Sequence, residues 1–151
     1  MDKNIITTNR KAFHDFNVFD KYDAGIVLTG TEIKSIRKAA INLKDSFCKI
    51  EDNEIFLYNC HISPYEQGNR FNHEAERKRK LLLTKKEILK MQNKVKQDGY
   101  TIVPLEVYIH KGFAKVQIGL AKGKKLHDKR DSIAKKDQQR EMDRAAKISK
   151  Y

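Results

Sequence analysis

The sequence predicts a mainly β protein, a small antiparallel β-barrel of the oligonucleotide-binding type with two to three short helices and a basic C-terminal tail. Three observations carry this prediction. Five or six short runs have the β-branched or alternating character of strands. Only two stretches before the tail have helical periodicity, and they do not alternate with the strands as in βαβ units. Small barrels with a helix at one end are typical of the oligonucleotide-binding fold.

The length of 151 residues predicts one domain with an appendage. We expect a flexible leader over residues 1–8, the barrel over residues 9–121 and the tail over residues 122–151. The leader lacks the apolar stretch of a signal peptide, and no apolar run has the length of a membrane-spanning helix. The sequence therefore predicts a cytoplasmic protein without a membrane partner.

The first half of the barrel is predicted to hold a strand, a helix and a hairpin. Ala24–Leu28 is apolar and β-branched, as in a short buried strand. Glu32–Ala40 has apolar side chains at helical spacing on one face. Phe47–Glu51 and Glu54–Asn59 alternate as the arms of a hairpin, and Asp52-Asn53 between them tolerates the positive φ of a tight turn.

This hairpin separates the two cysteines. In the expected register Cys48 lies opposite Leu57 and Cys60 lies opposite Asp45, so the thiols are three residues apart along the strands, about 10 Å. That distance exceeds the reach of a disulfide. We therefore expect both cysteines to be reduced, as in a cytosolic protein.

The second half begins with a loop and a helix. Ser63–Glu76 is rich in Asn, Gly and charge and is predicted to be a mobile loop. Arg77–Leu83 runs from four basic residues into three leucines and is predicted to be a strand entering the core. The sequence from Thr84 to Glu87 is a capping box, and the helix that it starts is expected to end at Gly99.

The clearest hairpin follows, with arms Thr101–His110 and Phe113–Ala121 and a turn at Lys111-Gly112. Apolar and polar residues alternate along both arms, which predicts one buried face and one face in water. Lys115 and Gln117 are expected on the wet face.

Charge predicts an anionic partner. The chain has 32 Lys and Arg against 20 Asp and Glu, a formal net charge of +12, with a pI near 9.7. Residues 121–151 hold eleven basic against five acidic residues, a net +6. Lysine and arginine release counterions from a phosphate backbone, and basic terminal arms often bind nucleic acid. A solvated tail without a partner is the alternative.

The tail composition also predicts its conformation. It has no Gly or Pro after Gly123 and is rich in helix formers. Met142, Ala145 and Ile148 form a stripe too narrow to hold a helix without a partner. We therefore expect the tail to be disordered alone and helical against RNA.

Residues that would mark an enzyme are absent from the sequence. No two histidines have the i,i+4 spacing of a helical metal site, no C-x-x-C is present, and no phosphate-binding glycine loop or nucleophile elbow occurs. We predict no catalytic residue, no metal and no cofactor. Other features favour RNA: further basic clusters at Arg10-Lys11, Lys34/Arg37/Lys38 and Arg77–Lys80, and candidate stacking rings Phe13, Tyr22, Phe71, Tyr108 and His127.

Seven motifs in order resemble the SmpB family, the small bacterial proteins that bind transfer-messenger RNA (SsrA RNA). They are Asn9-Arg-Lys-Ala-Phe-His14-Asp, Ala24-Gly25, Gly30-Thr-Glu-Ile-Lys34-Ser-Ile-Arg37, Asn42-Leu-x-Asp45-Ser, His61-Ile-x-Pro-Tyr65, Arg79-Lys-Leu-Leu-Leu83 and Leu120-Ala-Lys-Gly-Lys-Lys-x-His127-Asp-Lys-Arg130. The resemblance covers residues 9–150. It implies an oligonucleotide-binding barrel whose tail is unstructured off the ribosome.

The resemblance also implies two sets of site residues. The RNA-binding set is Asn9, Arg10, Lys11, His14, Asp23, Gly25, Lys34, Arg37, Leu82 and Lys115. The set expected at the decoding centre of the ribosome is Gly123, Lys124, Lys125, His127, Asp128, Lys129 and Arg130. The family usually has glutamate where this chain has Asp23, so the side chain here reaches one methylene less far.

The function that the resemblance implies is ribosome rescue without any bond made or broken by this protein. A monomer binds the tRNA-like domain of transfer-messenger RNA and enters stalled ribosomes with it, with elongation factor Tu bound indirectly through the RNA. The tail then occupies the empty mRNA channel. Two alternatives remain from the residues alone, a ribosomal or ribosome-assembly protein and an RNA-processing enzyme.

Overall fold

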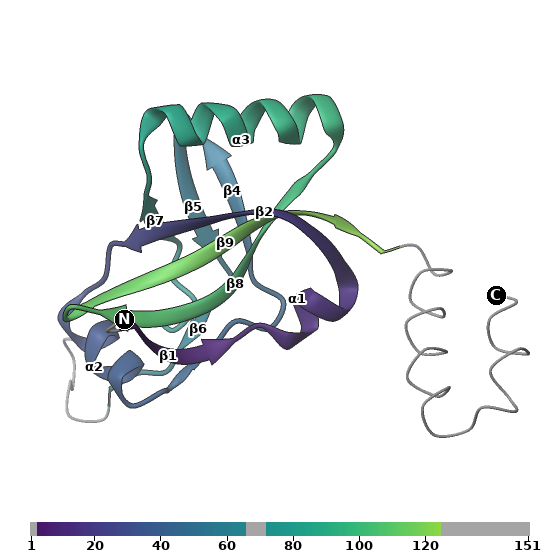
Figure 1. Ribbon diagram of the computed structural model, residues 1–151. Helices are drawn as coiled ribbons and strands as arrows, with labels where there is room; N and C mark the ends of the chain where they lie inside the picture. Colours follow the sequence, from purple (N-terminus) through teal and green to yellow (C-terminus); the bar gives the residue numbers. More distant parts are fainter. Residues whose placement is uncertain (1–2, 66–71, 125–151) are drawn as a thin grey trace, which may run out of the picture.

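The computed structural model describes residues 3–65 and 72–124, which alternate between strands and three helices (Figure 1). In chain order the elements are β1 (Lys3–Thr8), α1 (Arg10–Asp15), β2 (Phe16–Ile26), α2 (Gly30–Arg37), β3 (Ile41–Asn42), β4 (Phe47–Glu51), β5 (Glu54–Tyr58), β6 (His61–Ile62), β7 (Arg79–Leu82), α3 (Lys85–Asp98), β8 (Thr101–His110) and β9 (Phe113–Gly123). The predicted mainly β class with a few short helices is confirmed.

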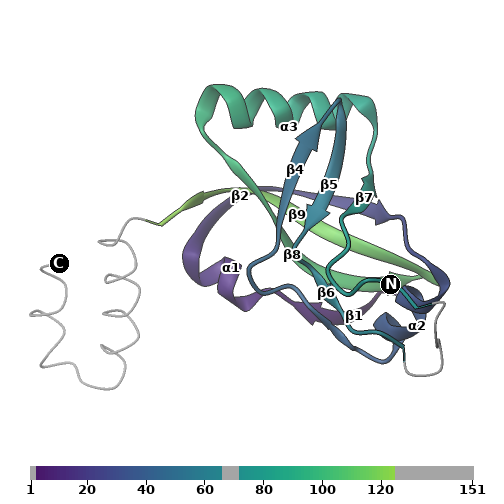
Figure 2. The same ribbon diagram turned by 180° about the vertical axis from the view of Figure 1, so that it is seen from behind.

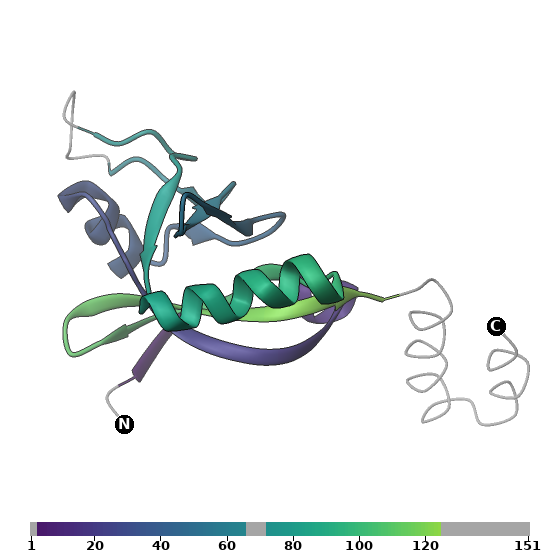
Figure 3. The same cartoon turned by 90° about the horizontal axis from the view of Figure 1, so that it is seen from above.

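The main sheet closes on itself. Its antiparallel pairings run β8–β4–β5–β7–β2–β9, and β9 pairs again with β8. Such a closed circuit is the arrangement of a small barrel. α3 lies across one end of the barrel (Figure 1, Figure 2), and seen from above it runs along β2 and β9, with β4 and β5 to one side (Figure 3). β3 and β6 form a separate two-stranded sheet.

Both predicted hairpins form, and their turns have the expected backbone. Asp52 and Asn53 have φ of 51° and 64°, and Lys111 and Gly112 have φ of 50° and 81°. These are the left-handed conformations that a tight hairpin turn requires. The first hairpin has the predicted register, with Cys48 opposite Leu57. Both cysteines are buried and free.

The barrel interior is one apolar core. It is filled from every strand of the circuit and closed by the buried face of α3, where Ile88 and Met91 lie. The helix begins at the predicted Thr84–Glu87 capping box and ends at Gly99, whose φ of 72° is the left-handed C-cap. The predicted position of this helix is therefore confirmed at both ends.

β8 and β9 are buried on more than one face, which corrects the prediction of a single wet face. Val103 and Leu105 pack in a second cluster with Ala121 and with Ala12 of α1. A register shift between Pro104 and Glu106 interrupts the alternation there. The prediction holds beyond this bulge, where Lys115 and Gln117 remain partly exposed.

The N-terminal leader is not loose. The prediction of a flexible segment over residues 1–8 is wrong for Lys3–Thr8, because β1 pairs with β8 along its length. Its side chains are mostly exposed, as expected of a strand at the sheet edge, and this weak apolar signal hid it. Residues 1–2 lie outside the described part of the chain.

The remaining boundaries shift slightly. The predicted helix at Glu32–Ala40 begins earlier, at Gly30, and ends at Arg37. Its first turn has a second capping box, in which Thr29 and Glu32 satisfy each other's backbone N–H groups. The predicted mobile loop Ser63–Glu76 is described only outside residues 66–71. Barrel strand β9 extends to Gly123, past the predicted boundary at residue 121.

Glu32 is the centre of a buried ion cluster. Its carboxylate accepts hydrogen bonds from the Arg79 Nε at 2.6 Å and the Arg77 Nη2 at 2.7 Å. The Glu32 and Arg79 side chains are completely buried. Arg79 also donates to the carbonyl oxygens of Cys60, Glu74 and Ala75. The cluster therefore ties α2 and β7 to the loop that precedes β7.

This cluster predicts acid-sensitive stability. Burial alone would raise the pKa of Glu32, but hydrogen bonds from Arg77, the Thr29 N–H and Arg79 hold that pKa at about 2 against an ordinary 4.5. A lowered folded-state pKa contributes stability that is complete above pH 4.5 and lost as the pH falls towards 2. The difference corresponds to a contribution on the order of 3 kcal/mol.

Urea unfolding of the protein at several pH values between 6 and 2 checks this expectation. Glu32→Gln should flatten the slope of unfolding free energy against pH below 4.5. An equal slope in the wild type and the variant would contradict a stabilising role for the ionised carboxylate.

Candidate nucleic-acid interface

Four of the predicted site residues meet on the outside of the barrel. Gly25 of β2 lies directly opposite Lys115 of β9 on one side and Leu82 of β7 on the other. Asp23 is two residues before Gly25 on the same strand and therefore shares its face. We call this surface the outer sheet face. Its members are Lys3 and Ile5 of β1, Asp23 and Gly25 of β2, Leu82 of β7, Tyr108 of β8, and Lys115 and Gln117 of β9.

A hydrogen bond from Tyr108 holds the Asp23 carboxylate. The Tyr108 hydroxyl donates to the Asp23 Oδ1 at 2.9 Å, and burial together with this bond raises the pKa of Tyr108 to about 12. Lys3 adds a cation 4.4 Å from the centre of the Tyr108 ring and pairs with Glu106 at 2.6 Å. Tyr108 therefore holds in place the only acidic side chain of the predicted RNA-binding set.

Leu82 gives this face an exposed apolar side chain. It is 52% exposed although it lies on a barrel strand. A Cβ at Gly25 would come within 3.3 Å of the Leu82 Cβ, tighter than ordinary contact. Glycine at position 25 therefore leaves room for Leu82 to lie flat against β2. Leu82 lies across Gly25 from Lys115, so it can pack on a base or ribose while Lys115 and Asp23 meet the polar groups of the RNA.

Asn9 supports the fold from within. It is only 5% exposed, its side-chain Oδ1 accepts from the Ala12 N–H, and its Nδ2 donates to the Pro104 carbonyl at 2.8 Å. These bonds cap α1 and fix it to β8. The geometry therefore favours a positioning role for Asn9 rather than the predicted direct contact with RNA.

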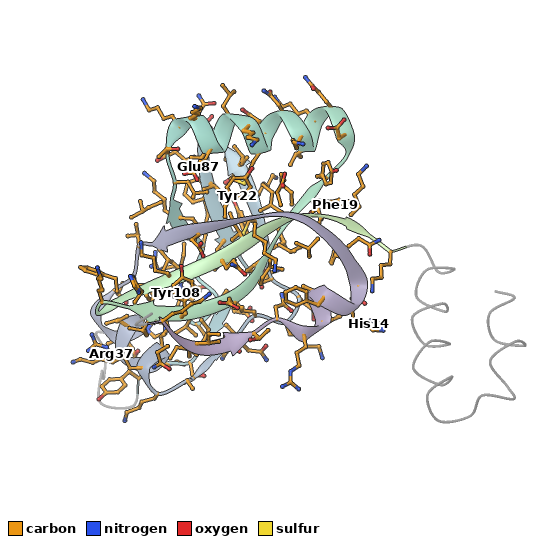
Figure 4. The ribbon with its side chains drawn as sticks, in the orientation of Figure 1. His14, Phe19, Tyr22, Arg37, Glu87 and Tyr108 are labelled. Atoms are coloured by element: carbon orange, nitrogen blue, oxygen red, sulfur yellow. The ribbon has the colours of Figure 1, made fainter. Side chains whose placement is uncertain are left out.

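The other predicted residues of α1 are exposed. Arg10 is at its first turn, Lys11 pairs with Asp45, and the His14 Nδ1 lies 2.9 Å from the Asp15 Oδ1. The hydrogen bond with Asp45 raises the pKa of Lys11. His14 lies at the opposite end of the molecule from Arg37, near the start of the tail (Figure 4). α1 is thus a second basic surface, separate from the outer sheet face.

α2 carries a third basic surface. Lys34, Arg37 and Lys38 are exposed on it, and the ammonium groups of both lysines lie over the Tyr65 ring, 5.5 and 5.0 Å from its centre. The predicted residues Lys34 and Arg37 are therefore close to each other but on a different element from Lys115.

The basic run at residues 77–80, predicted to favour RNA, is not a free cationic patch. Arg77 and Arg79 pair with Glu32, while Lys78 pairs with Glu51 and Lys80 with Glu54. Alternation along the strand sends Arg79 inwards, where its charge is compensated. The Thr-x-x-Glu sequence at residues 29–32 indicates that Glu32 caps a helix. No local pattern indicates that Glu32 also pairs with two arginines.

The candidate stacking rings within the described residues differ in exposure and do not form one surface. Phe13 is 40% exposed, with the Lys21 ammonium 5.7 Å from its centre. Tyr22 packs against the core, and Tyr108 is only 7% exposed. Phe71 lies outside the described residues.

Only the start of the predicted tail site belongs to the described chain. Gly123 ends β9, and the Lys124 N–H donates to the Asp15 carbonyl at 2.8 Å, which anchors the start of the tail to the end of α1. Lys125, His127, Asp128, Lys129 and Arg130, with the predicted helix around Met142, lie outside the described residues.

Residues 3–65 and 72–124 contain no helix long and apolar enough to cross a membrane. Within the same two ranges, no group of three or more His, Cys, Asp or Glu side chains is placed to hold a metal ion.

The fold and these surfaces define the class of the protein, a small, basic, antiparallel β-barrel protein with charged and apolar side chains together on its outer sheet face. The family described as SmpB protein matches residues 6–148. The chain belongs to the SmpB family, as its motifs predicted.

Individual relatives agree with this assignment. The SsrA-binding protein of Carboxydothermus hydrogenoformans is 56% identical over 141 residues, which cover 93% of this chain and 95% of the relative. That of Shouchella clausii is 59% identical over 143 residues, 95% of this chain and 92% of the relative. A chain of the solved structure described as "tmRNA-SmpB: a journey to the center of the bacterial ribosome" matches with a TM-score of 0.69 at 44% identity, covering 84% of this chain and 93% of that chain.

Proposed function

We propose that this protein binds the tRNA-like domain of transfer-messenger RNA and delivers it to stalled ribosomes, where trans-translation tags the incomplete peptide and releases the ribosome. The observation that carries the proposal is its identity of 56–59% to SsrA-binding proteins over nearly the whole chain. The partners are then transfer-messenger RNA, the small ribosomal subunit and, through the RNA, elongation factor Tu. The protein acts as a monomer in the bacterial cytoplasm.

The outer sheet face has the chemistry that an RNA contact needs. Lys115 can neutralise a phosphate, and Leu82 can pack on a base or ribose. Asp23 repels phosphate, so its oxygens suit a donor such as a ribose 2′-hydroxyl or a base amino group. A carboxylate held by Tyr108 within a basic face therefore favours one orientation of the RNA over non-specific backbone binding.

Binding and mimicry account for this function without catalysis. The barrel holds the folded RNA, and the basic tail occupies the mRNA channel, which is empty only on a stalled ribosome. The channel is lined with ribosomal RNA, and a narrow cationic chain matches that surface electrostatically. Gly123, Lys124, Lys125, His127, Asp128, Lys129 and Arg130 would lie at the decoding centre.

The double variant Arg10→Ala/Lys115→Ala tests the RNA-binding part of the proposal. It should weaken binding to transfer-messenger RNA and reduce the slope of log affinity against log salt by about 1 for each phosphate that is no longer neutralised. Filter binding between low and physiological salt measures both. The matched control is Lys85→Ala/Lys86→Ala, which removes two exposed charges from α3. Equal reductions in the two double variants would mean that only total charge matters.

Two assays separate the proposal from its alternatives. A ribosomal or assembly protein would co-sediment with ribosomes in cells that lack transfer-messenger RNA, whereas recruitment here should need that RNA. An RNA-processing enzyme would cleave tRNA with added divalent metal, and we expect the RNA to stay intact.

A further inference from the structure

A cavity of about 230 Å³ lies on the α3 side of the barrel, away from the residues of the outer sheet face. It lies where the second half of α3 faces β4 and the start of β8. Its apolar lining includes Ile50, Val95 and Ile102, and Gln92 and Thr101 add polar groups. The Tyr100 ring forms part of its wall. A volume of this size admits one planar heterocycle but no drug-sized ligand.

Cations gather at this cavity. Lys49 and Lys96 are among its lining residues, and no Asp or Glu is. Lys94 and Lys122 lie with their ammonium groups 5.9 and 4.7 Å from the centre of the Tyr100 ring. Lysines held over a ring remain mobile enough to turn towards a phosphate.

An exposed aromatic side chain lies against Tyr100. Phe19 is 55% exposed and meets Tyr100 edge to face, with ring centres 5.2 Å apart. It lies in the register shift of β2 between Val18 and Asp20, which directs it towards α3 (Figure 4). A large apolar ring left in water beside lysines is the combination that stacks bases in proteins that bind single strands.

A second cavity beside α3 differs in its charges. It is larger, about 420 Å³, but Asp52 and Glu54 are in its lining with Lys85. Carboxylates there disfavour a phosphate, so size alone does not select the ligand. The Tyr100 cavity combines lysines and an aromatic wall with a lining free of carboxylates, and the cavity at Asp52 does not.

We propose that the Tyr100 cavity is a second nucleic-acid site, which takes one unstacked base of a single-stranded RNA while Lys49, Lys94, Lys96 and Lys122 hold the flanking phosphates. Gln92 and Thr101 supply hydrogen-bonding groups for the edge of the base. Lys122 is two residues before the end of the described chain, so RNA in this site runs next to the start of the tail. The site is independent of the outer sheet face and of the RNA that this face binds.

Titration of the ¹⁵N-labelled full-length protein with a single-stranded adenylate hexamer tests the proposal. Signals of the Thr101 amide and the Gln92 side-chain amide should shift first. Tyr100→Leu should weaken hexamer binding by about tenfold, as expected when one base no longer stacks, and Tyr100→Phe should restore it. Lys49→Ala/Lys96→Ala should reduce the salt slope by about 0.7 for each phosphate contact, whereas Lys85→Ala/Lys86→Ala should leave it unchanged.

Two further binding measurements distinguish the possible outcomes. If adenosine monophosphate shifts the same signals as strongly as the hexamer, the cavity binds a free nucleotide and the RNA proposal is overturned. Equal hexamer binding by Tyr100→Leu and the wild type would also overturn it. Affinity for the tRNA-like domain of transfer-messenger RNA should stay unchanged in Lys49→Ala/Lys96→Ala. A reduction there as large as in Arg10→Ala/Lys115→Ala would mean that the two sites are not separate. Failure at the cavity alone leaves the proposed function intact.

Discussion

A chain that ends at Lys124 should bind transfer-messenger RNA within about threefold of the full-length affinity and should support no tagging on stalled ribosomes. The Lys124 N–H is the last backbone group bonded to the described barrel, so this cut leaves every described contact in place. Residues 125–151 hold nine basic and five acidic residues, a net +4, which adds only a non-specific contribution to RNA binding.

The reason for the complete loss of tagging is that tail and barrel contact different partners. A barrel that still holds its RNA cannot reach into the mRNA channel without the tail. Tagging in a reconstituted translation system with a message lacking a stop codon measures the second function, and filter binding measures the first.

A chain with the order of residues 125–151 shuffled is the matched control, because it keeps length and charge. We expect it to fail in tagging too, since Asp128, Lys129 and Arg130 then leave their places. A truncated chain whose affinity for transfer-messenger RNA falls as severely as that of Arg10→Ala/Lys115→Ala would contradict this division.

Glu32→Ala should destabilise the protein by about 3–5 kcal/mol, the range for removing one partner of a buried ion pair. The variant leaves Arg79 with a buried guanidinium and only carbonyl acceptors. It also removes one half of the α2 capping box. A typical domain has only about 5–15 kcal/mol of stability, so the substitution removes a large part of its margin.

The chain offers a matched control in Glu87, which has the same capping-box position in α3 but no arginine partner among the ion pairs of residues 3–65 and 72–124. Glu87→Ala should cost about 0.5–2 kcal/mol, as for the removal of a helix cap. Urea unfolding at neutral pH measures both variants. Similar destabilisation in the two would show that Glu32 acts through its cap alone.

Local patterns predicted the elements that depend on local chemistry. The turn pairs Asp52-Asn53 and Lys111-Gly112 and the caps Thr84 and Gly99 are where the sequence indicated, because the residues near each of them determine their conformation. The alternation that placed Lys115 outside holds for the same reason.

Contacts between distant segments could not be predicted in this way. β1 is a strand only because β8 accepts it at the sheet edge, and Val103 is buried only because α1 covers it. Arg79 resembles its basic neighbours in sequence but differs completely in burial, since its partner Glu32 lies 47 positions away. The resemblance to the family indicated Gly25, Leu82 and Lys115 as site residues. Periodicity within each strand could not predict that these three residues lie side by side.

The claim that the outer sheet face recognises one folded RNA is tested most directly by competition at physiological salt. Purified full-length protein is titrated with the isolated tRNA-like domain of transfer-messenger RNA against a structured RNA of equal length and unrelated fold. We predict a preference of at least about 100-fold for the tRNA-like domain, a modest ratio for specific recognition of nucleic acid. Asp23→Lys should lower that ratio while raising affinity for the unrelated RNA. Equal affinity of the wild type for the two RNAs would contradict the account.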